Sequence, residues 1–214
     1  RWRRLYLTSI AGLMVITAPL SGLLVLFAEP LVLTLFGAQW APSAPIFVAL
    51  AISILIQPVY TSAGWIYVSL GRTRRLMRAG IVATAWYCSA FLIGLKFGGF
   101  GVALAYACSI FFLTPPWLWW ATRGTALSLR DIVQIVWPPI LSTVGAGVVA
   151  VALPSLAGSS ILDGAARTAG FLAIYVALLF TTCLLFPSWR RDIQPLLDQA
   201  SRATVFLSAL RLRS

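Results

Sequence analysis

The chain contains no histidine and only five acidic residues among its 214 amino acids. These acids are Glu29, Asp131, Asp163, Asp192 and Asp198. All five lie at the ends of apolar stretches or in loops, so we expect no pair of carboxylates that could act as general acid and base. The sequence also predicts no strand followed by a glycine-rich phosphate loop. We therefore expect a protein that is not an enzyme and that uses no metal or other cofactor.

Cysteine is equally scarce, with three residues in all: Cys88, Cys108 and Cys183. Each lies inside an apolar stretch, and none has the spacing of a metal site or a redox motif. We interpret them as small apolar packing residues. They do not indicate a redox compartment.

Charged residues make up only 10% of the chain, whereas hydrophobic residues make up 60% and the mean hydropathy is +0.93. Water-soluble domains carry about 25% charged residues, and a water-soluble fold could not bury this much apolar surface. Six apolar stretches are long enough to cross a hydrocarbon layer of about 30 Å. They cover residues 5–28, 44–70, 79–95, 102–121, 132–153 and 168–186. We predict an all-α, polytopic transmembrane bundle with six spans.

The fifth stretch contains two adjacent prolines, Pro138 and Pro139, which divide it. Just before it, Ser128 and Asp131 have the spacing of a helix capping box. We therefore expect a short interfacial helix first, followed by a span that begins near Pro138.

The 16 Lys and Arg residues give the chain a net charge of +11 and occur in small clusters between the apolar stretches. Membrane topology explains this placement better than nucleic-acid binding does, because Lys and Arg in short loops stay on the cytoplasmic side. With six alternating spans, fourteen of the 16 fall on one side, and only Lys96 and Arg167 fall on the other. We predict that both ends are cytoplasmic and that nucleic acid is not a partner.

The second stretch holds most of the polar residues at mid-membrane depth, namely Gln57, Pro58, Tyr60, Thr61, Ser62 and Gly64. Pro58 frees backbone carbonyls, which neighbouring helices, side chains or water must satisfy. Broken helices with polar flanks line transport cavities. We take four of these residues as substrate-cavity candidates: Gln57, Pro58, Tyr60 and Ser62. The alternative is a structural kink at which Ser62 and Gly64 allow close helix packing.

The loop after this stretch carries four arginines, Arg72, Arg74, Arg75 and Arg78. Guanidinium groups suit a lipid diphosphate or an anionic headgroup, so these arginines are candidates for binding either. The alternative is that they only anchor the topology.

Aromatic and glycine residues mark the ends of the fourth stretch. Trp117, Trp119 and Trp120 lie at its end, where we interpret them as anchors at the membrane interface rather than a platform for sugars. The four residues of GGFG at 98–101 precede the stretch and are expected to make a tight external turn.

Four phrases along the chain are similar to one known family. They are LFGAQWAPSAPIFVAL at 35–50, YVSLGRTRRLMR at 67–78, FGGFGVALAYACS at 97–109 and LSLRDI at 127–132. Together they resemble the C-terminal half of Wzx-type flippases for O-antigen and exopolysaccharide. These flippases belong to the MOP superfamily, which also contains the MATE drug exporters.

The resemblance implies much of the expected organisation. Members have fourteen helices with cytoplasmic ends, so six spans would correspond to helices nine to fourteen. Residues 1–122 would be four helices of the C-terminal transport bundle, and residues 123–187 an interfacial segment with the two terminal helices. Residues 188–214, with apolar residues at spacings of three and four, are predicted to be a cytoplasmic amphipathic tail. The chain starts at Arg1 without a signal peptide, and we expect it to be a fragment.

The resemblance also implies the activity. It is the translocation of undecaprenyl-diphosphate-linked oligosaccharide across the bacterial inner membrane for polysaccharide biosynthesis. Implied partners are membrane lipids, the lipid-linked oligosaccharide, the missing N-terminal half of the same chain and polysaccharide polymerase machinery. One alternative is a MATE-like exporter of drugs or cations, although no acid lies at mid-depth to hold a cation. A membrane-bound glycan-processing enzyme and a noncatalytic scaffold are further alternatives.

Overall fold

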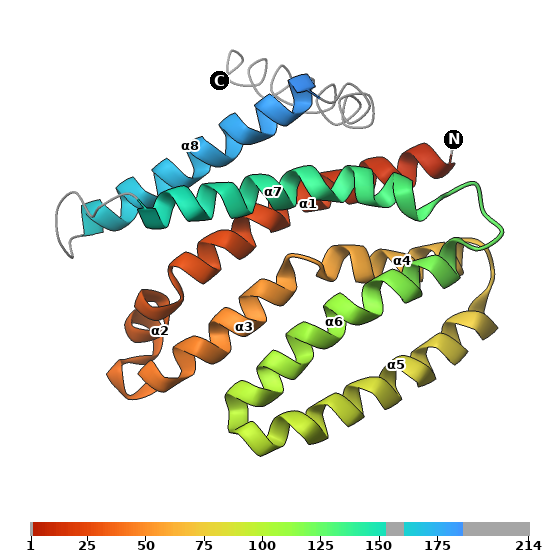
Figure 1. The fold of residues 1–214 in the computed structure, drawn as a ribbon, viewed down its shortest axis with the longest axis horizontal. Helices are drawn as coiled ribbons and strands as arrows, with labels where there is room; N and C mark the ends of the chain where they lie inside the picture. Colours follow the sequence, from red (N-terminus) through yellow and green to blue (C-terminus); the bar gives the residue numbers. More distant parts are fainter. Residues whose placement is uncertain (1, 153–160, 186–214) are drawn as a thin grey trace, which may run out of the picture.

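The computed structural model describes residues 2–152 and 161–185, and this part of the chain is helical, with no strand (Figure 1). Its α-helices are α1 (Trp2–Leu26), α2 (Ala28–Phe36), α3 (Ala44–Ile54), α4 (Gln57–Ser69), α5 (Thr73–Gly94), α6 (Gly98–Thr122), α7 (Leu129–Ala152) and α8 (Ile161–Leu185). Two short 3₁₀ helices, η1 (Ala38–Ser43) and η2 (Leu95–Phe97), connect some of them. The all-helical prediction is confirmed for these residues. The predicted tail at 188–214 lies outside them.

Among the described residues, four helical segments are long and apolar enough to cross a membrane, or five if the bent pair of α3 and α4 forms one span. One of these segments, Thr73–Thr122, comprises α5 and α6, which lie antiparallel and in contact (Figure 1). The outer faces carry large apolar side chains, such as Phe112 and Val151, whose exposed fractions are 71% and 74%. Such faces suit lipid. A membrane protein is therefore supported, whereas six spans stays a prediction.

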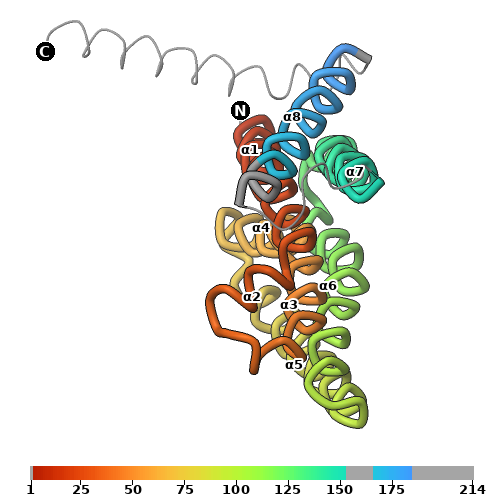
Figure 2. Tube along the Cα trace, turned by 90° about the vertical axis from the view of Figure 1, so that its left-hand side faces the viewer, coloured from red at the N-terminus to blue at the C-terminus, as the bar shows by residue number. Residues whose placement is uncertain are grey.

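The helices form two adjoining layers, with α1, α7 and α8 in one and α3 to α6 in the other (Figures 1 and 2). The largest core lies where α1, α4, α6 and α7 converge. Fully or almost fully buried side chains there include Ile10, Met14, Ile66, Tyr67 and Ile132. This core joins the two layers, because α1 packs along α7 in its own layer and also contacts α3 and α4 in the other.

Two prolines explain the two bends in the first part of the chain. Pro30 and Pro58 cannot donate a hydrogen bond to the carbonyl four residues earlier, which opens the helix just before each proline. The interruption falls at Phe27 between α1 and α2, and at residues 55–56 between α3 and α4, where the bend is 44°. The predicted break at Pro58 is confirmed. Near it the helix tightens, since the amide of Leu55 donates to the carbonyl of Ile52 at 3.2 Å.

The expected division of the fifth stretch at its two prolines is wrong. Helix α7 is continuous from Leu129 to Ala152, with Pro138 and Pro139 fully buried inside it. Their missing amide hydrogens are tolerated because packing against α1 and α8 holds the helix on both sides. The Thr143 hydroxyl also donates to the carbonyl of Pro139 at 2.9 Å. Here tertiary packing outweighs the local preference of proline.

Most described cations lie at one end of the bundle, which we call the cation-rich end. It contains the start of α1, the α4–α5 turn and the loop from α6 to α7, which lie together on the right of Figure 1. Lys96 and Arg167 lie toward the opposite end, in the α5–α6 turn and early in α8. Gly98, with φ of +70°, makes the predicted turn between α5 and α6. The segregation of cations within the described residues agrees with alternating spans, while cytoplasmic termini stay a prediction.

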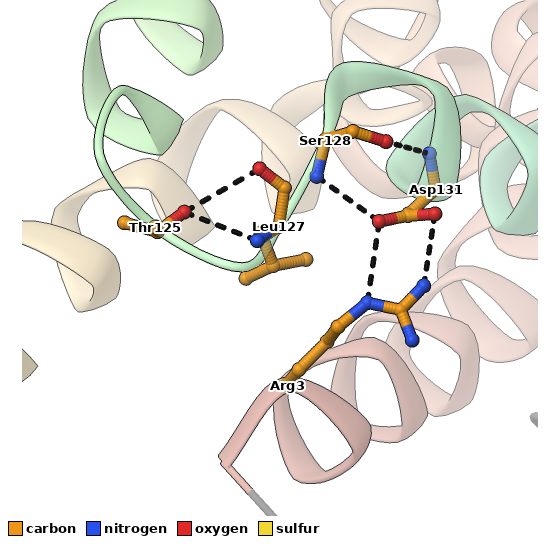
Figure 3. A network of polar contacts seen from close by, with 5 residues as sticks. All are labelled: Arg3, Thr125, Leu127, Ser128 and Asp131. Carbon is orange, nitrogen blue, oxygen red and sulfur yellow. Dashed lines mark hydrogen bonds and ion pairs between the residues drawn. The ribbon is translucent and has the colours of Figure 1, made fainter.

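A capping box and an ion pair join α1 to α7 at this end (Figure 3). The amide of Asp131 donates to the Ser128 hydroxyl at 3.2 Å, and the Ser128 amide donates to the Asp131 carboxylate at 3.0 Å. Arg3 donates to the same carboxylate through Nε at 3.2 Å and forms an ion pair through Nη2 at 2.9 Å. The predicted capping box is confirmed, and it also anchors Arg3.

We expect Asp131→Asn to lower stability by about 1 kcal/mol near neutral pH. Burial raises the pKa of Asp131, but hydrogen bonds from Arg3 and Ser128 lower it by more, so the net pKa lies below the ordinary value. The charged form therefore stabilises the fold above about pH 4, and this contribution disappears as the pH falls through the lowered pKa. Thermal unfolding in detergent should separate the variant from wild type at pH 7, and the difference should shrink as the pH falls below about 4. An unchanged difference at pH 3 would contradict the ion-pair account.

Candidate functional site

Two glycine turns shape the surface at the cation-rich end. Gly71, with φ of +66°, ends α4, and Gly124, with φ of +72°, follows α6. These left-handed conformations cost glycine little and let the chain reverse direction. After the first turn, the Arg72 amide donates to the Tyr67 carbonyl at 2.8 Å, which closes the end of α4. The chain then enters α5 with its arginines beside the end of α6.

Arg72 connects the two turns directly. Its Nη1 donates to the carbonyl oxygen of Arg123 at 2.7 Å, and its Nη2 donates to that of Gly124 at 3.4 Å. A Cβ at position 124 would lie at an ordinary contact distance of 3.4 Å from Arg72 Nη2, so glycine is favoured here by its positive φ and not by lack of space. Arg72 therefore has a structural task, since it ties the α4–α5 turn to the end of α6.

A cavity of about 500 Å³ opens beside this tether. It is lined by Arg72, Arg75, Arg78, Trp120, Arg123 and Gly124, and we call it the arginine cavity. Residues spaced by three lie on one side of a helix, which brings Arg75 and Arg78 of α5 to the cavity, together with Arg72 just before the helix, and leaves Arg74 out of its lining. No acidic side chain lines it among the described residues. A cavity lined by charge of one sign concentrates ligands of the opposite sign, here anions.

Arg123 is held from a second side by an aromatic ring. Its guanidinium lies 4.0 Å from the ring centroid of Trp119, which is a cation–π contact. The sequence alone predicts Arg123 to be one of the fourteen cations on the cytoplasmic side and Trp120 to be an interface anchor. Their place in the arginine cavity depends on the contact between residues 72 and 123, for which the sequence carries no signal.

The structure separates the four cavity candidates of the second stretch. Gln57 is exposed at the bend and Pro58 is half-buried beside it. Tyr60 is half-buried and stacks on Trp117, with ring centroids 5.3 Å apart. Ser62 is fully buried on the opposite side of α4, where its hydroxyl lies 2.9 Å from that of Tyr6 and donates to the Val59 carbonyl at 2.7 Å.

Only part of the predicted site therefore comes together. Tyr60 lies on the side of α4 that faces α6, the helix whose end lines the arginine cavity. Ser62 lies on the other side of α4 and contacts α1. Among the described residues, no three potential metal ligands of the His, Cys, Asp or Glu type meet. The chemistry that this arrangement supports is the binding of an anion at the end of a membrane bundle.

The comparison with known families bears on the start of the chain. Residues 1–45 match the family described as Polysaccharide biosynthesis protein. The matched segment covers α1, α2 and η1 and includes most of the first phrase noted in the sequence. No curated protein and no solved structure matches the chain. The match supports a membrane protein with a role in polysaccharide biosynthesis.

Proposed function

We propose that this chain is part of a flippase that moves undecaprenyl-diphosphate-linked oligosaccharide from the cytoplasmic to the outer leaflet of the bacterial inner membrane. The observation that carries the proposal is the arginine cavity at one end of a bundle of apolar helices. The family match of residues 1–45 supports the connection with polysaccharide biosynthesis.

The chemistry of the cavity suits a diphosphate. Guanidinium groups form paired, charge-assisted hydrogen bonds with phosphate oxygens. Arg75, Arg78 and Arg123 reach the cavity from two helix ends, and Arg72 holds those ends together. At the level of the lipid headgroups, such a site would hold the diphosphate while the lipid tail stays in the bilayer. A carrier of cationic drugs would instead need acids in this position.

The test compares arginines inside and outside the cavity. We expect Arg75→Gln and Arg78→Gln each to weaken binding of undecaprenyl diphosphate about tenfold, because each loses a charge-assisted contact. Arg74→Gln is the matched control, since it removes the same charge from the same turn of helix without changing the lining. Binding is measured on the purified protein in detergent, and glycan export is measured in cells beside membrane abundance.

Equal losses for all three variants would show that only total charge matters and would contradict the site. Inverted topology would do the same, because the arginines would then act as anchors. A cysteine introduced at Thr73 checks this, since a membrane-impermeant thiol reagent added from outside should not label it in any of the variants. Arg72 is left intact because its side chain also holds the end of α6 through the Arg123 carbonyl. A loss of binding in an Arg72 variant could therefore result from a change in folding.

A further inference from the structure

A second feature is a row of aromatic rings across α4, α5 and α6. Trp117 stacks on Tyr60 at 5.3 Å, Tyr87 stacks on Tyr106 at 5.8 Å, and Phe91 lies 6.5 Å from Tyr106. Tyr60 and Tyr87 join the two halves, since their hydroxyls interact. We call these five residues the aromatic strip. Each of them is half-buried, so part of each side chain is accessible.

The aromatic strip extends from the arginine cavity far into the membrane region. Trp117 lies one helical turn from Trp120, which lines the cavity. At 1.5 Å per residue, the eleven steps from Trp117 to Tyr106 along α6 correspond to about 16 Å. The strip therefore covers about half the thickness of a hydrocarbon layer of about 30 Å.

The polar groups of the strip indicate what it faces. Tyrosine is usual at membrane interfaces, where its hydroxyl meets water. Tyr60, Tyr87 and Tyr106 instead belong to the inner parts of their helices. Tyr60 is near the middle of the bent span of α3 and α4, and Tyr87 and Tyr106 are several turns from the cation-rich ends of α5 and α6. Lipid cannot accept their hydrogen bonds, and exposing them to it is costly. The hydroxyls of Tyr60 and Tyr87 interact with each other. Water or a polar cargo on this face satisfies the hydrogen-bonding capacity that this contact leaves over.

We propose that the aromatic strip binds the sugar rings of the lipid-linked glycan while the arginine cavity holds its diphosphate. The inference rests on the proposed function and adds the residues that contact the sugars. It gives Trp117 the sugar-platform role that its interpretation as an interface anchor had set aside. The C–H face of a pyranose ring packs on an aromatic face, and its hydroxyl groups pair with phenol hydroxyls. Contacts of this kind are neutral and individually weak. They suit a cargo that must slide along the protein and be released.

The test uses the full-length protein and removes one aromatic ring at a time. The variants are Tyr60→Leu and Tyr87→Leu, with Tyr60→Phe and Tyr87→Phe to keep the ring. Trp86→Leu is the control, because Trp86 adjoins Tyr87 in sequence but is 48% exposed and takes part in none of the strip's ring contacts. The protein is reconstituted in liposomes with undecaprenyl diphosphate that carries a short oligosaccharide, and binding of bare undecaprenyl diphosphate is measured in parallel.

We expect the leucine variants to move the glycan-bearing lipid about five- to tenfold more slowly, as the loss of one aromatic contact predicts. They should bind the bare lipid as wild type does, and the phenylalanine and Trp86 variants should keep most of their transport. Full transport by both leucine variants, or an equal loss with Trp86→Leu, would overturn the sugar-binding role of the aromatic strip and leave the proposed function standing. Failure of the wild type to bind bare undecaprenyl diphosphate would instead overturn the proposed function.

A second measurement does not depend on how well the leucine variants fold. In a background with Cys88, Cys108 and Cys183 changed to serine, a cysteine at position 87 should react with a water-soluble thiol reagent. Addition of the glycan-bearing lipid should protect it, and a cysteine at position 86 should show no such protection. An unreactive position 87, or one that the glycan-bearing lipid does not protect, would overturn the inference.

Discussion

Replacing Gly101 with alanine should destabilise the bundle by about 3 kcal/mol, which is the upper range for forcing extra volume into a packed site. A Cβ at Gly101 would overlap the backbone carbonyl of Gly94 and the Cβ of Phe97. The converse holds as well, since a Cβ at Gly94 would lie 2.7 Å from the carbonyl oxygen of Gly101. Backbone cannot rotate away as a side chain can. The start of α6 would have to move off the end of α5.

The control for this prediction is Gly80→Ala in α5. Nothing lies within 4 Å of a Cβ built at Gly80, so alanine there adds no clash. It should leave stability unchanged or raise it by roughly 0.5–1 kcal/mol, because glycine in a helix interior is unfavourable. Thermal unfolding in detergent, or loss of helical signal on titration with a denaturing detergent, measures both variants. If Gly101→Ala were as stable as wild type, the close approach of α5 and α6 would be incorrect.

The second large effect is expected at the bend between α3 and α4. Pro58→Ala restores an amide that can donate to the carbonyl four residues earlier, and this favours a straighter helix. The 44° bend places exposed Gln57 at mid-span and carries Tyr60 to Trp117. If the helix must bend during transport, export should fall about tenfold, equivalent to about 1.4 kcal/mol on the barrier, with little change in protein abundance.

Pro116→Ala is the matched control for Pro58→Ala. Pro116 is exposed and lies inside α6, which continues through it. Removing it should leave export near the wild-type level. Gln57→Leu at the bend should lower export, because it removes a neutral hydrogen-bonding group from the proposed path. Normal export by both Pro58→Ala and Gln57→Leu would make the bend a packing feature alone.

The broad character of the protein could be predicted from local sequence. Long apolar stretches, interrupted by short cationic turns, predict membrane helices whatever their neighbours are. Glycines at 71 and 98 predict the turns that they make, since both adopt positive φ. Pro58 predicts a broken helix, because the missing amide hydrogen is a property of proline itself and does not depend on its neighbours. Ser128 and Asp131 predict the start of α7 through their spacing.

Local sequence predicted the wrong structure where tertiary packing is strong, and it gave no information about contacts between distant segments. Pro138 and Pro139 predict a break by their chemistry, yet burial between α1 and α8 keeps α7 whole. The sequence by itself determined a helical membrane protein with its cations at one end, because hydropathy and charge act residue by residue. Only the tertiary structure decided that Arg123 joins Arg75 and Arg78 while Arg74 does not, and that Tyr60 meets Trp117 while Ser62 meets Tyr6. These choices depend on how each helix is rotated against its neighbours, which is set by side chains far away in the chain.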